Sequence, residues 1–331
     1  MLFDASIHPS SLREIPETAR RAEDCGFDAL WTSETQHNPF LPIALAAEHS
    51  ENLQLGTSVA IGFARSPTEL AHTAWDLSQQ SGGRFILGLG TQVKAHIERR
   101  FGMDWPDSPV GKFRELIAGI RSVWGRWQQG EELNFRGEYY TLTLMSPFFN
   151  PGPIEHPKIP IHIAGVNPGL CRLAGEIANG FHVHPLHTVR YLRESVIPAI
   201  KEGADRAQRS LSEVPLTISA FVVNDEKEEQ FVRSQIAFYA STPSYRKVMA
   251  LHGWGDVAEA LSAMARRREW DSMPAVITDE MLRLLAVVAN EEDTARALKE
   301  KYSGLAHRIK LYRPFFPGER DEFWRRLCAE I

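Results

Sequence analysis

The stretch LQLGTSVAIGFARSPTELAHTAWDLSQQSGGRFILGLGTQ, residues 53–92, decides the fold. An apolar segment that predicts a strand passes through small residues into a helix, and a second strand then stops at Gly-Leu-Gly. Ser66 is the predicted N-cap of the helix, Pro67 its first residue and Glu69 the partner in a capping box. Both strands end on Gly, Ser, Thr and Ala rather than on the bulky residues expected of a core.

The same alternation of strand and helix runs along the whole chain. The predicted strands are 3–7, 28–33, 53–59, 85–90, 159–165, 180–185, 216–223 and 307–312. Parallel neighbours need right-handed helical crossovers, so the pattern predicts an α/β fold, an eight-stranded parallel (β/α)8 TIM barrel. We expect a single domain, 1–331, with insertions at about 111–158 and 239–285. In such a barrel the chemistry collects at the carboxyl ends of the strands.

Composition excludes several classes of partner. Hydrophobic residues make up 43% of the chain, charged residues 24%, and the net charge is −5. These values are ordinary for a globular protein and favour neither a nucleic acid nor an anionic membrane as a partner. We expect no signal peptide and no membrane span. The three cysteines are far apart in sequence, form no metal-ligand or redox pair, and fit a reducing cytoplasm.

The predicted strand ends carry most of the candidate site residues. The first two strands end near Ser6, His8 and 34–37, and the fourth ends at Gly88 and Gly90. Gly-Leu-Gly is no dinucleotide fingerprint, because the third glycine and the downstream acid are missing.

After strand five, IAGVNPGL makes Asn167 a predicted N-cap and Pro168 the first helical residue. Free backbone N–H groups at a helix N-terminus suit a phosphate, although every capped helix shares this pattern.

A cluster of histidines offers a different class of function. His182 and His184 lie two residues apart on strand six and share a face, and His162 lies on strand five. With a further acidic ligand these residues would suit a metal-dependent hydrolase, but no such ligand stands out. Hydrogen bonding within a polar barrel mouth is the alternative interpretation, and we assign no metal site.

Three blocks together carry a resemblance to a known family. GFDALWTSETQHNPF, the opening stretch as far as FILGLG, and PIHIAGVNPGLCRLAGEIANGF occur in matching order. The chain resembles the bacterial luciferase-like monooxygenase superfamily over nearly its whole length, and especially the branch that uses coenzyme F420. The resemblance implies the same eight-stranded barrel.

The resemblance also implies a cofactor site. In these families the strand after LQLGT has a bulge with a non-prolyl cis peptide, here expected at Ser58–Val59, and the ring rests against it. Gly88, Gly90 and Thr91 would flank the ring or its ribityl tail, and the corner 164–167 would hold the phosphate. Ordinary strand-end capping is the alternative for Ser58 and Thr91. The implied cofactor-binding residues are Thr35, Ser58, Val59, Ala60, Gly88, Gly90, Thr91, Ala164, Gly165, Val166 and Asn167.

The implied catalytic residues follow strand two. Deazaflavin relatives commonly have an acid followed directly by histidine there, whereas Glu34 is followed by Thr35 and the nearby imidazole is His37. His37 is a candidate acid or base, or it stabilises a turn. Glu34 is a candidate to bind a ring hydroxyl or to orient His37, or it forms a surface salt bridge.

The expected activity is hydride transfer between F420 and a small organic substrate. Reduced-FMN-dependent monooxygenation is the alternative, and a family member without catalysis is a further one. The segment 239–256, with Tyr239, Tyr245 and Trp254, is predicted to cover the barrel mouth or contribute to it. The resemblance alone implies a homodimer.

Overall fold

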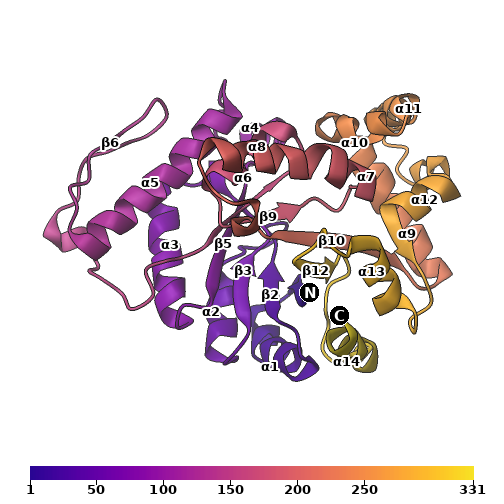
Figure 1. Cartoon of the computed structure of the whole chain (residues 1–331), viewed down its shortest axis with the longest axis horizontal. Coiled ribbons are helices and arrows are strands. Elements are labelled where there is room, and N and C mark those ends of the chain that lie inside the picture. The colour runs from indigo at the N-terminus through magenta and orange to yellow at the C-terminus, as the bar shows by residue number, and fades with distance from the viewer. The chain divides into compact units, whose positions relative to one another are not determined.

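The chain folds as a parallel (β/α)8 TIM barrel (Figure 1), described here by a computed structural model of residues 1–331. The barrel strands are β1 (Leu2–Ile7), β2 (Ala29–Thr32), β3 (Gln54–Thr57), β5 (Phe85–Gly90), β8 (Ile161–Gly165), β9 (Gly180–Val183), β10 (Leu216–Val223) and β12 (Arg308–Leu311). Each strand pairs with the next one in this order. Strand β10 pairs with both β9 and β12, and β12 pairs with β1, so the sheet closes into a barrel. The predicted fold class is confirmed.

Contacts divide the chain into two compact units. The N-terminal unit contains residues 7–23 and 29–164, and the C-terminal unit contains 1–6, 24–28 and 165–331. The organisation as a single domain, with insertions at about 111–158 and 239–285, stays a prediction.

The N-terminal unit is built on β2, β3, β5 and β8, with the two-residue strand β4 (Ala60–Ile61) beside β5. Its other elements are α1 (Ile15–Cys25), α2 (Leu41–Glu48), α3 (Pro67–Gln80), α4 (Lys94–Arg99), α5 (Pro109–Gln129) and the hairpin of β6 (Phe135–Arg136) and β7 (Thr141–Leu142). Helix α3 begins at Pro67 as predicted, because the Ser66 side chain accepts a hydrogen bond from the Glu69 N–H at 3.1 Å. The other half of the predicted capping box is not formed, since the Glu69 carboxylate accepts from Thr73 instead. It packs against α5 through Trp75, which is buried against Trp124 and Trp127.

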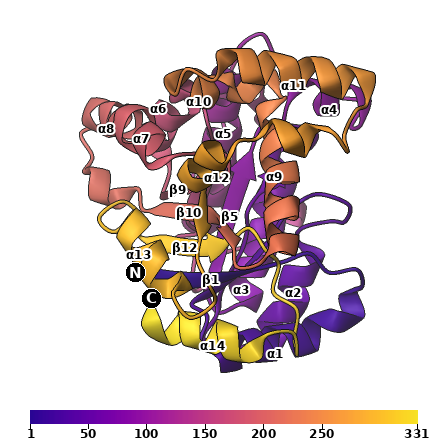
Figure 2. The same cartoon turned by 90° about the vertical axis from the view of Figure 1, so that its right-hand side faces the viewer.

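The C-terminal unit joins β1, β12, β10 and β9 by parallel pairing. Its helices are α6 (Pro168–Ile177), α7 (Val189–Tyr191), α8 (Ile197–Arg206), α9 (Glu226–Ala240), α10 (Arg246–Leu251), α11 (Gly255–Arg267), α12 (Asp279–Leu285), α13 (Thr294–Tyr302) and α14 (Asp321–Glu330). Figure 2 shows α9, α10 and α11 as one helical group, in which α11 contacts both α9 and α10. None of the helices has the length and apolarity that crossing a bilayer requires.

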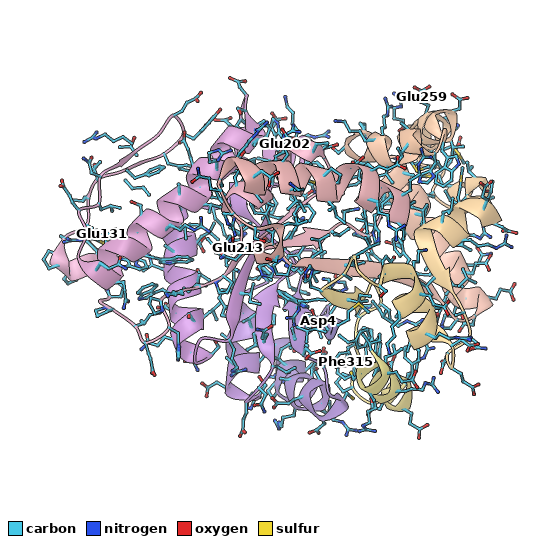
Figure 3. All side chains as sticks on the ribbon, viewed as in Figure 1. Asp4, Glu131, Glu202, Glu213, Glu259 and Phe315 are labelled. Atoms are coloured by element: carbon cyan, nitrogen blue, oxygen red, sulfur yellow. The ribbon has the colours of Figure 1, made fainter.

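A buried ion pair links β1 to β12 in this unit. Asp4, labelled in Figure 3, accepts two hydrogen bonds from the Arg308 guanidinium, at 2.7 and 2.8 Å. The side chains are 0% and 7% exposed, so the pair lies inside the protein. A bidentate geometry of this kind offsets the desolvation of both charges.

One strand was missing from the sequence prediction. No strand was predicted between 216–223 and 307–312, but β11 (Ala286–Val288) lies there and pairs with the end of β10. The pairing extends the sheet at this point beyond the eight barrel strands.

Candidate active site

The corner at residues 58–59 is the centre of the candidate site in the N-terminal unit. The Ser58–Val59 peptide bond is cis, which confirms the conformation that the resemblance implied. The Ser58 N–H donates to the Thr32 carbonyl at 2.6 Å, and the Glu34 N–H donates to the Val59 carbonyl at 3.3 Å. Two backbone hydrogen bonds therefore tie the corner to the end of β2.

Below this corner, large side chains form a buried floor. Trp31 is 1% exposed, and its ring centroid lies 6.1 Å from that of His162. A Cβ added to Gly56 would lie 2.5 Å from the Trp31 ring, so only glycine fits at this position. The face that carries Trp31, Gly56 and His162 is thus closed at this level.

Further along the strands, small residues dominate the region next to the corner. Side chains alternate along a strand, so Ala164 follows His162 on this face of β8, and Ser58 comes directly after β3 at the cis bond. Gly88 pairs with His162, and a Cβ added to Gly90 would lie 2.8 Å from Cγ2 of Val59 and 4.0 Å from Cβ of Ala164. The four residues Ser58, Gly88, Gly90 and Ala164 are called the small-residue wall below. Val59 packs against Gly90, and no other bulky side chain comes from these positions of the opening stretch.

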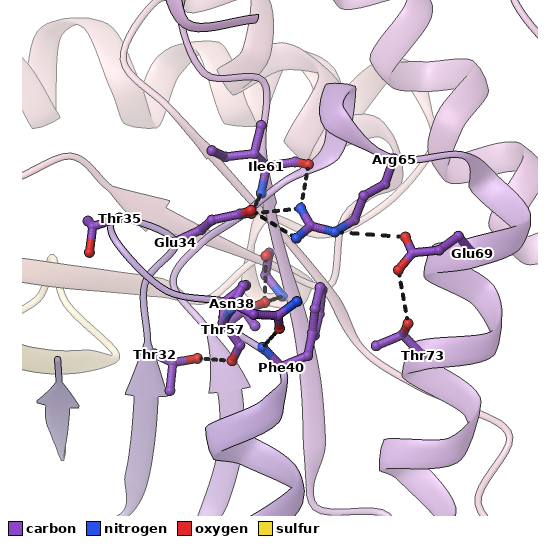
Figure 4. A network of polar contacts seen from close by, with 12 residues as sticks. Thr32, Glu34, Thr35, Asn38, Phe40, Thr57, Ile61, Arg65, Glu69 and Thr73 are labelled. Atoms are coloured by element: carbon purple, nitrogen blue, oxygen red, sulfur yellow. Dashed lines mark hydrogen bonds and ion pairs between the residues drawn. The ribbon is translucent and has the colours of Figure 1, made fainter. Parts of the chain in front are cut away.

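Glu34 holds the other side of the corner in place (Figure 4). Its carboxylate accepts hydrogen bonds from Arg65 Nη1 at 2.7 Å and Nη2 at 2.8 Å, and from the Ile61 N–H at 2.7 Å. The Glu34 and Arg65 side chains are 7% and 12% exposed, and the guanidinium also lies over the Phe40 ring. Glu34 is therefore part of a largely shielded ion pair rather than a surface salt bridge, and its oxygens are engaged by the protein.

The remaining residues of the loop after β2 are exposed. Thr35 and His37 both face solvent, and the Thr35 carbonyl accepts a hydrogen bond from Arg100. Thr91 is half-buried after β5, and its hydroxyl donates to the Gln92 carbonyl at 3.1 Å. The roles of Glu34, Thr35, His37 and Thr91 toward a ligand stay predictions.

A second imidazole, that of His8, lies at this corner and was not predicted to have a catalytic role. His8 follows β1, and its Nε2 lies 2.6 Å from the hydroxyl of Ser33, which follows β2. Ser33 lies between Thr32 and Glu34, the two residues bonded to the 58–59 corner. The sequence places His8 at the end of the first predicted strand, but only the topology of the barrel brings this strand end next to the end of β2.

The predicted phosphate corner lies in the C-terminal unit at the start of α6. Asn167 occupies the N-cap position, but its side chain makes no capping hydrogen bond and instead donates to the Ser244 carbonyl at 3.2 Å. Asp225, by contrast, caps α9 with its side chain. The first turn of α6 keeps backbone N–H groups without a side-chain cap, which suits an anion. A Cβ added to Gly165 would lie 2.7 Å from that of Leu170, so this position is tightly packed.

Aromatic residues gather at the carboxyl ends of β9 and β12 in the same unit. The His184 ring stacks on Tyr245 at 4.2 Å between centroids and meets Tyr239 edge-on at 4.6 Å. The hydroxyls of Tyr239 and Tyr312 lie 2.7 Å apart, and Tyr312 donates to Gln235 at 2.9 Å. The insertion residues Tyr239 and Tyr245 thus lie beside strand ends, where the sequence analysis placed them.

Two histidines of the loop after β9 are held neutral. Burial lowers the pKa of His184 to about 3, with a further contribution from His187. The Leu186 N–H donates to Nδ1 of His184 at 3.1 Å, so the neutral ring carries its proton on Nε2. Burial also lowers the pKa of His187 to about 4. His184 therefore presents an uncharged donor within the aromatic group.

A pocket of about 460 Å³ opens beside the same aromatic group. Tyr312 lines it together with Phe221, Phe231, Phe316 and Arg313. Phe231 and Phe316 are 48% and 44% exposed, which gives the pocket an apolar rim. The sequence analysis did not identify this pocket, because its residues come from two separate segments.

The metal-site alternative receives no support. No group of three or more His, Cys, Asp or Glu side chains is arranged to hold a metal ion. The hydrolase interpretation of His162, His182 and His184 is not carried further.

The family model of the luciferase-like monooxygenases matches residues 2–308, and the chain belongs to this family. It is an enzyme of the luciferase-like oxidoreductase class. An uncharacterized protein of Mycobacterium tuberculosis is 41% identical over 313 residues, covering 93% of this chain and 92% of that protein. The F420-dependent glucose-6-phosphate dehydrogenase of Amycolatopsis mediterranei is 30% identical, covering 69% and 70%.

Solved structures share the fold. The F420-dependent tetrahydromethanopterin reductase of Methanopyrus kandleri superposes with a TM-score of 0.79 at 20% identity, covering 100% of this chain and 99% of that one. At this identity the likeness shows the barrel fold alone.

Proposed function

We propose that this protein is an F420-dependent oxidoreductase that transfers a hydride between the deazaflavin and a small organic substrate. The observation that carries the proposal is the small-residue wall of Ser58, Gly88, Gly90 and Ala164 above the Trp31 floor. A flat ring needs such a surface, because side chains larger than these would occupy its volume. The similarity to an F420-dependent dehydrogenase supports the deazaflavin over FMN.

Two features of the chain suit the two parts of the cofactor, its flat ring and its phosphate. Strand β8 carries the wall residue Ala164 and then Gly165, after which α6 begins with its uncapped first turn. We assign the ring to the wall and the phosphate to this turn, where the helix dipole favours a negative charge. Thr35, Val59, Ala60, Thr91 and Val166 complete the proposed contacts. When bound, the deazaflavin supplies the hydride chemistry, and the protein supplies position and electrostatics.

The chain's own residues have separable roles in this proposal. Glu34, held by Arg65 and the Ile61 N–H, fixes the shape of the corner rather than exchanging protons. In the C-terminal unit, the neutral His184 keeps its proton on Nε2 and packs against Tyr239 and Tyr245. We further propose a homodimer in a reducing cytoplasm, in line with the resemblance.

Monooxygenation with reduced FMN is the second candidate function. The description of the family as luciferase-like monooxygenases favours it. FMN also has a flat ring and a phosphate, so the wall and the α6 turn suit both cofactors. The two candidates differ in which cofactor binds and in whether oxygen is consumed.

The phosphate assignment predicts the effect of a charge at residue 167. Asn167→Asp places a negative charge at the first turn of α6 and is expected to weaken F420 binding about tenfold, which corresponds to about 1.4 kcal/mol. The measurement is a fluorescence titration with F420 and with its deazaflavin fragment that lacks the phosphate. Binding of the fragment should stay unchanged.

Asn167→Ser is the matched control, because it also removes the bond to Ser244 but adds no charge. It should change F420 affinity by less than about threefold. Equal losses for the two variants, or equal losses for F420 and the fragment, would contradict the phosphate assignment.

A further inference from the structure

We propose that His8, oriented by Ser33, is the acid–base residue that exchanges a proton with the substrate. The inference rests on the proposed function and replaces His37 in the role that the sequence analysis gave it. Its basis is the 2.6 Å contact between His8 Nε2 and Ser33 Oγ, which joins the ends of β1 and β2.

The position of Ser33 puts this pair beside the small-residue wall. The preceding carbonyl, of Thr32, binds the Ser58 N–H, and the following N–H, of Glu34, binds the Val59 carbonyl. Ser33 comes directly after β2 and stands between these two bonded residues. The imidazole is therefore bonded to a residue that lies next to the 58–59 corner, against which we place the ring.

The loop residue His37 lacks this arrangement. It lies three residues beyond Glu34, in the exposed segment that also contains Thr35. His8 is also exposed, but the Ser33 hydroxyl fixes its ring beside the corner. A base must first be held within reach of its proton, and of the two histidines it is His8 that bonds to a residue beside the corner.

The proton step balances with the hydride step. When bound, the oxidised deazaflavin would take up the hydride, which is the hydrogen of the substrate C–H bond with its electron pair. The O–H or N–H proton passes to the His8–Ser33 pair, a C=O or C=N bond forms, and the imidazole is left protonated. His8 then returns the proton to water, to which it is exposed. In the reductive direction the same pair donates the proton.

Histidine footprinting with oxidised F420 tests whether His8 lies at the cofactor. The full-length protein is treated with diethyl pyrocarbonate, with and without saturating F420, and modification is quantified by mass spectrometry. We expect F420 to reduce the modification of His8 at least fivefold, and that of the exposed control His37 by less than about 1.5-fold. Failure of F420 to bind in a parallel titration would overturn the proposed function. Binding that leaves His8 unprotected would overturn this inference alone.

Variants separate proton transfer from binding. In a panel of small alcohols and amines followed by F420 reduction, His8→Gln should lower kcat by about 10²–10⁴-fold with KM and F420 affinity within about threefold. Ser33→Ala should lower kcat less, because it frees the ring without removing it, and His37→Gln should leave it within about threefold. A His37→Gln variant with the larger loss would return the role to the loop, and a His8→Gln variant that keeps its kcat would overturn the inference.

Discussion

Replacing Glu34 by alanine is expected to lower the free energy of unfolding by about 3–5 kcal/mol. The change removes the carboxylate that binds both Nη atoms of Arg65 and the Ile61 N–H. It leaves a guanidinium that is only 12% exposed without its partner. A shielded charge that loses its counter-ion costs more than the pair itself contributes. Chemical denaturation followed by circular dichroism measures the loss.

Glu69→Ala is the matched control for this prediction. Glu69 also faces Arg65, at 3.8 Å from Nε, but its side chain is 49% exposed. Exposed pairs contribute about 0–1 kcal/mol, so this variant should lose far less stability. Glu34→Gln should fall between the two, because it keeps an oxygen for the Ile61 N–H. Equal stability of Glu34→Ala and Glu69→Ala would show that the ion pair does not hold the corner.

Acidification is expected to destabilise the protein through His187. Burial lowers the pKa of this histidine from 6.5 to about 4 in the folded state, so the unfolded chain binds the proton more readily. Stability is therefore lost as the pH falls below about 6.5, and the loss continues to about 4. From about pH 7 to about pH 5 this one group accounts for a loss of about 2 kcal/mol.

The neutral form of His187 has specific partners in the structure. Its Nδ1 donates to the His184 carbonyl at 2.8 Å, and its Nε2 accepts from the Tyr302 hydroxyl at 3.1 Å. His187→Gln keeps polar atoms there but cannot take up the proton, so its stability should fall less steeply with acid. The difference in free energy of unfolding between wild type and variant should narrow by about 2 kcal/mol from about pH 7 to about pH 5. Chemical denaturation at each pH measures this difference. A difference that stays constant over this range would refute the assignment.

Most of the barrel could be predicted because each strand–helix unit carries its own local signals. The Ser66 cap, the Pro67 start and the strand FILGLG are all encoded within a few residues of one another. Strand β11 could not be predicted in this way. It has three residues, Ala-Val-Val, directly after α12, and only its pairing with β10 makes it a strand.

The candidate site was predictable in part for a related reason. The resemblance placed the corner at Ser58–Val59, and the cis bond is there. Local sequence could not reveal that Glu34 is bound by Arg65, 31 residues away, or that Ser33 contacts His8, 25 residues away. Such contacts depend on which strand ends the barrel brings together, whereas the resemblance points to an imidazole in the loop after β2 alone.

For the segment 239–256, the sequence likewise predicted a location but not the contacts made there. The Tyr and Trp residues of the segment 239–256 predicted a contribution at the barrel mouth, and Tyr245 stacks on His184 at the end of β9. The hydrogen-bonded chain from Tyr239 through Tyr312 to Gln235 depends on the return of α9 toward β12. Residue types predicted the location, and the tertiary fold determines the chemistry.

The proposed function requires this chain to bind a deazaflavin on the small-residue wall. The most direct measurement is a pair of parallel fluorescence titrations of the purified protein, one with oxidised F420 and one with FMN. We predict saturable binding of F420 that is at least about tenfold tighter than that of FMN, a difference of about 1.4 kcal/mol. Tighter binding of FMN would contradict the claim in favour of an oxygen-using monooxygenase, and binding of neither would contradict both cofactor assignments.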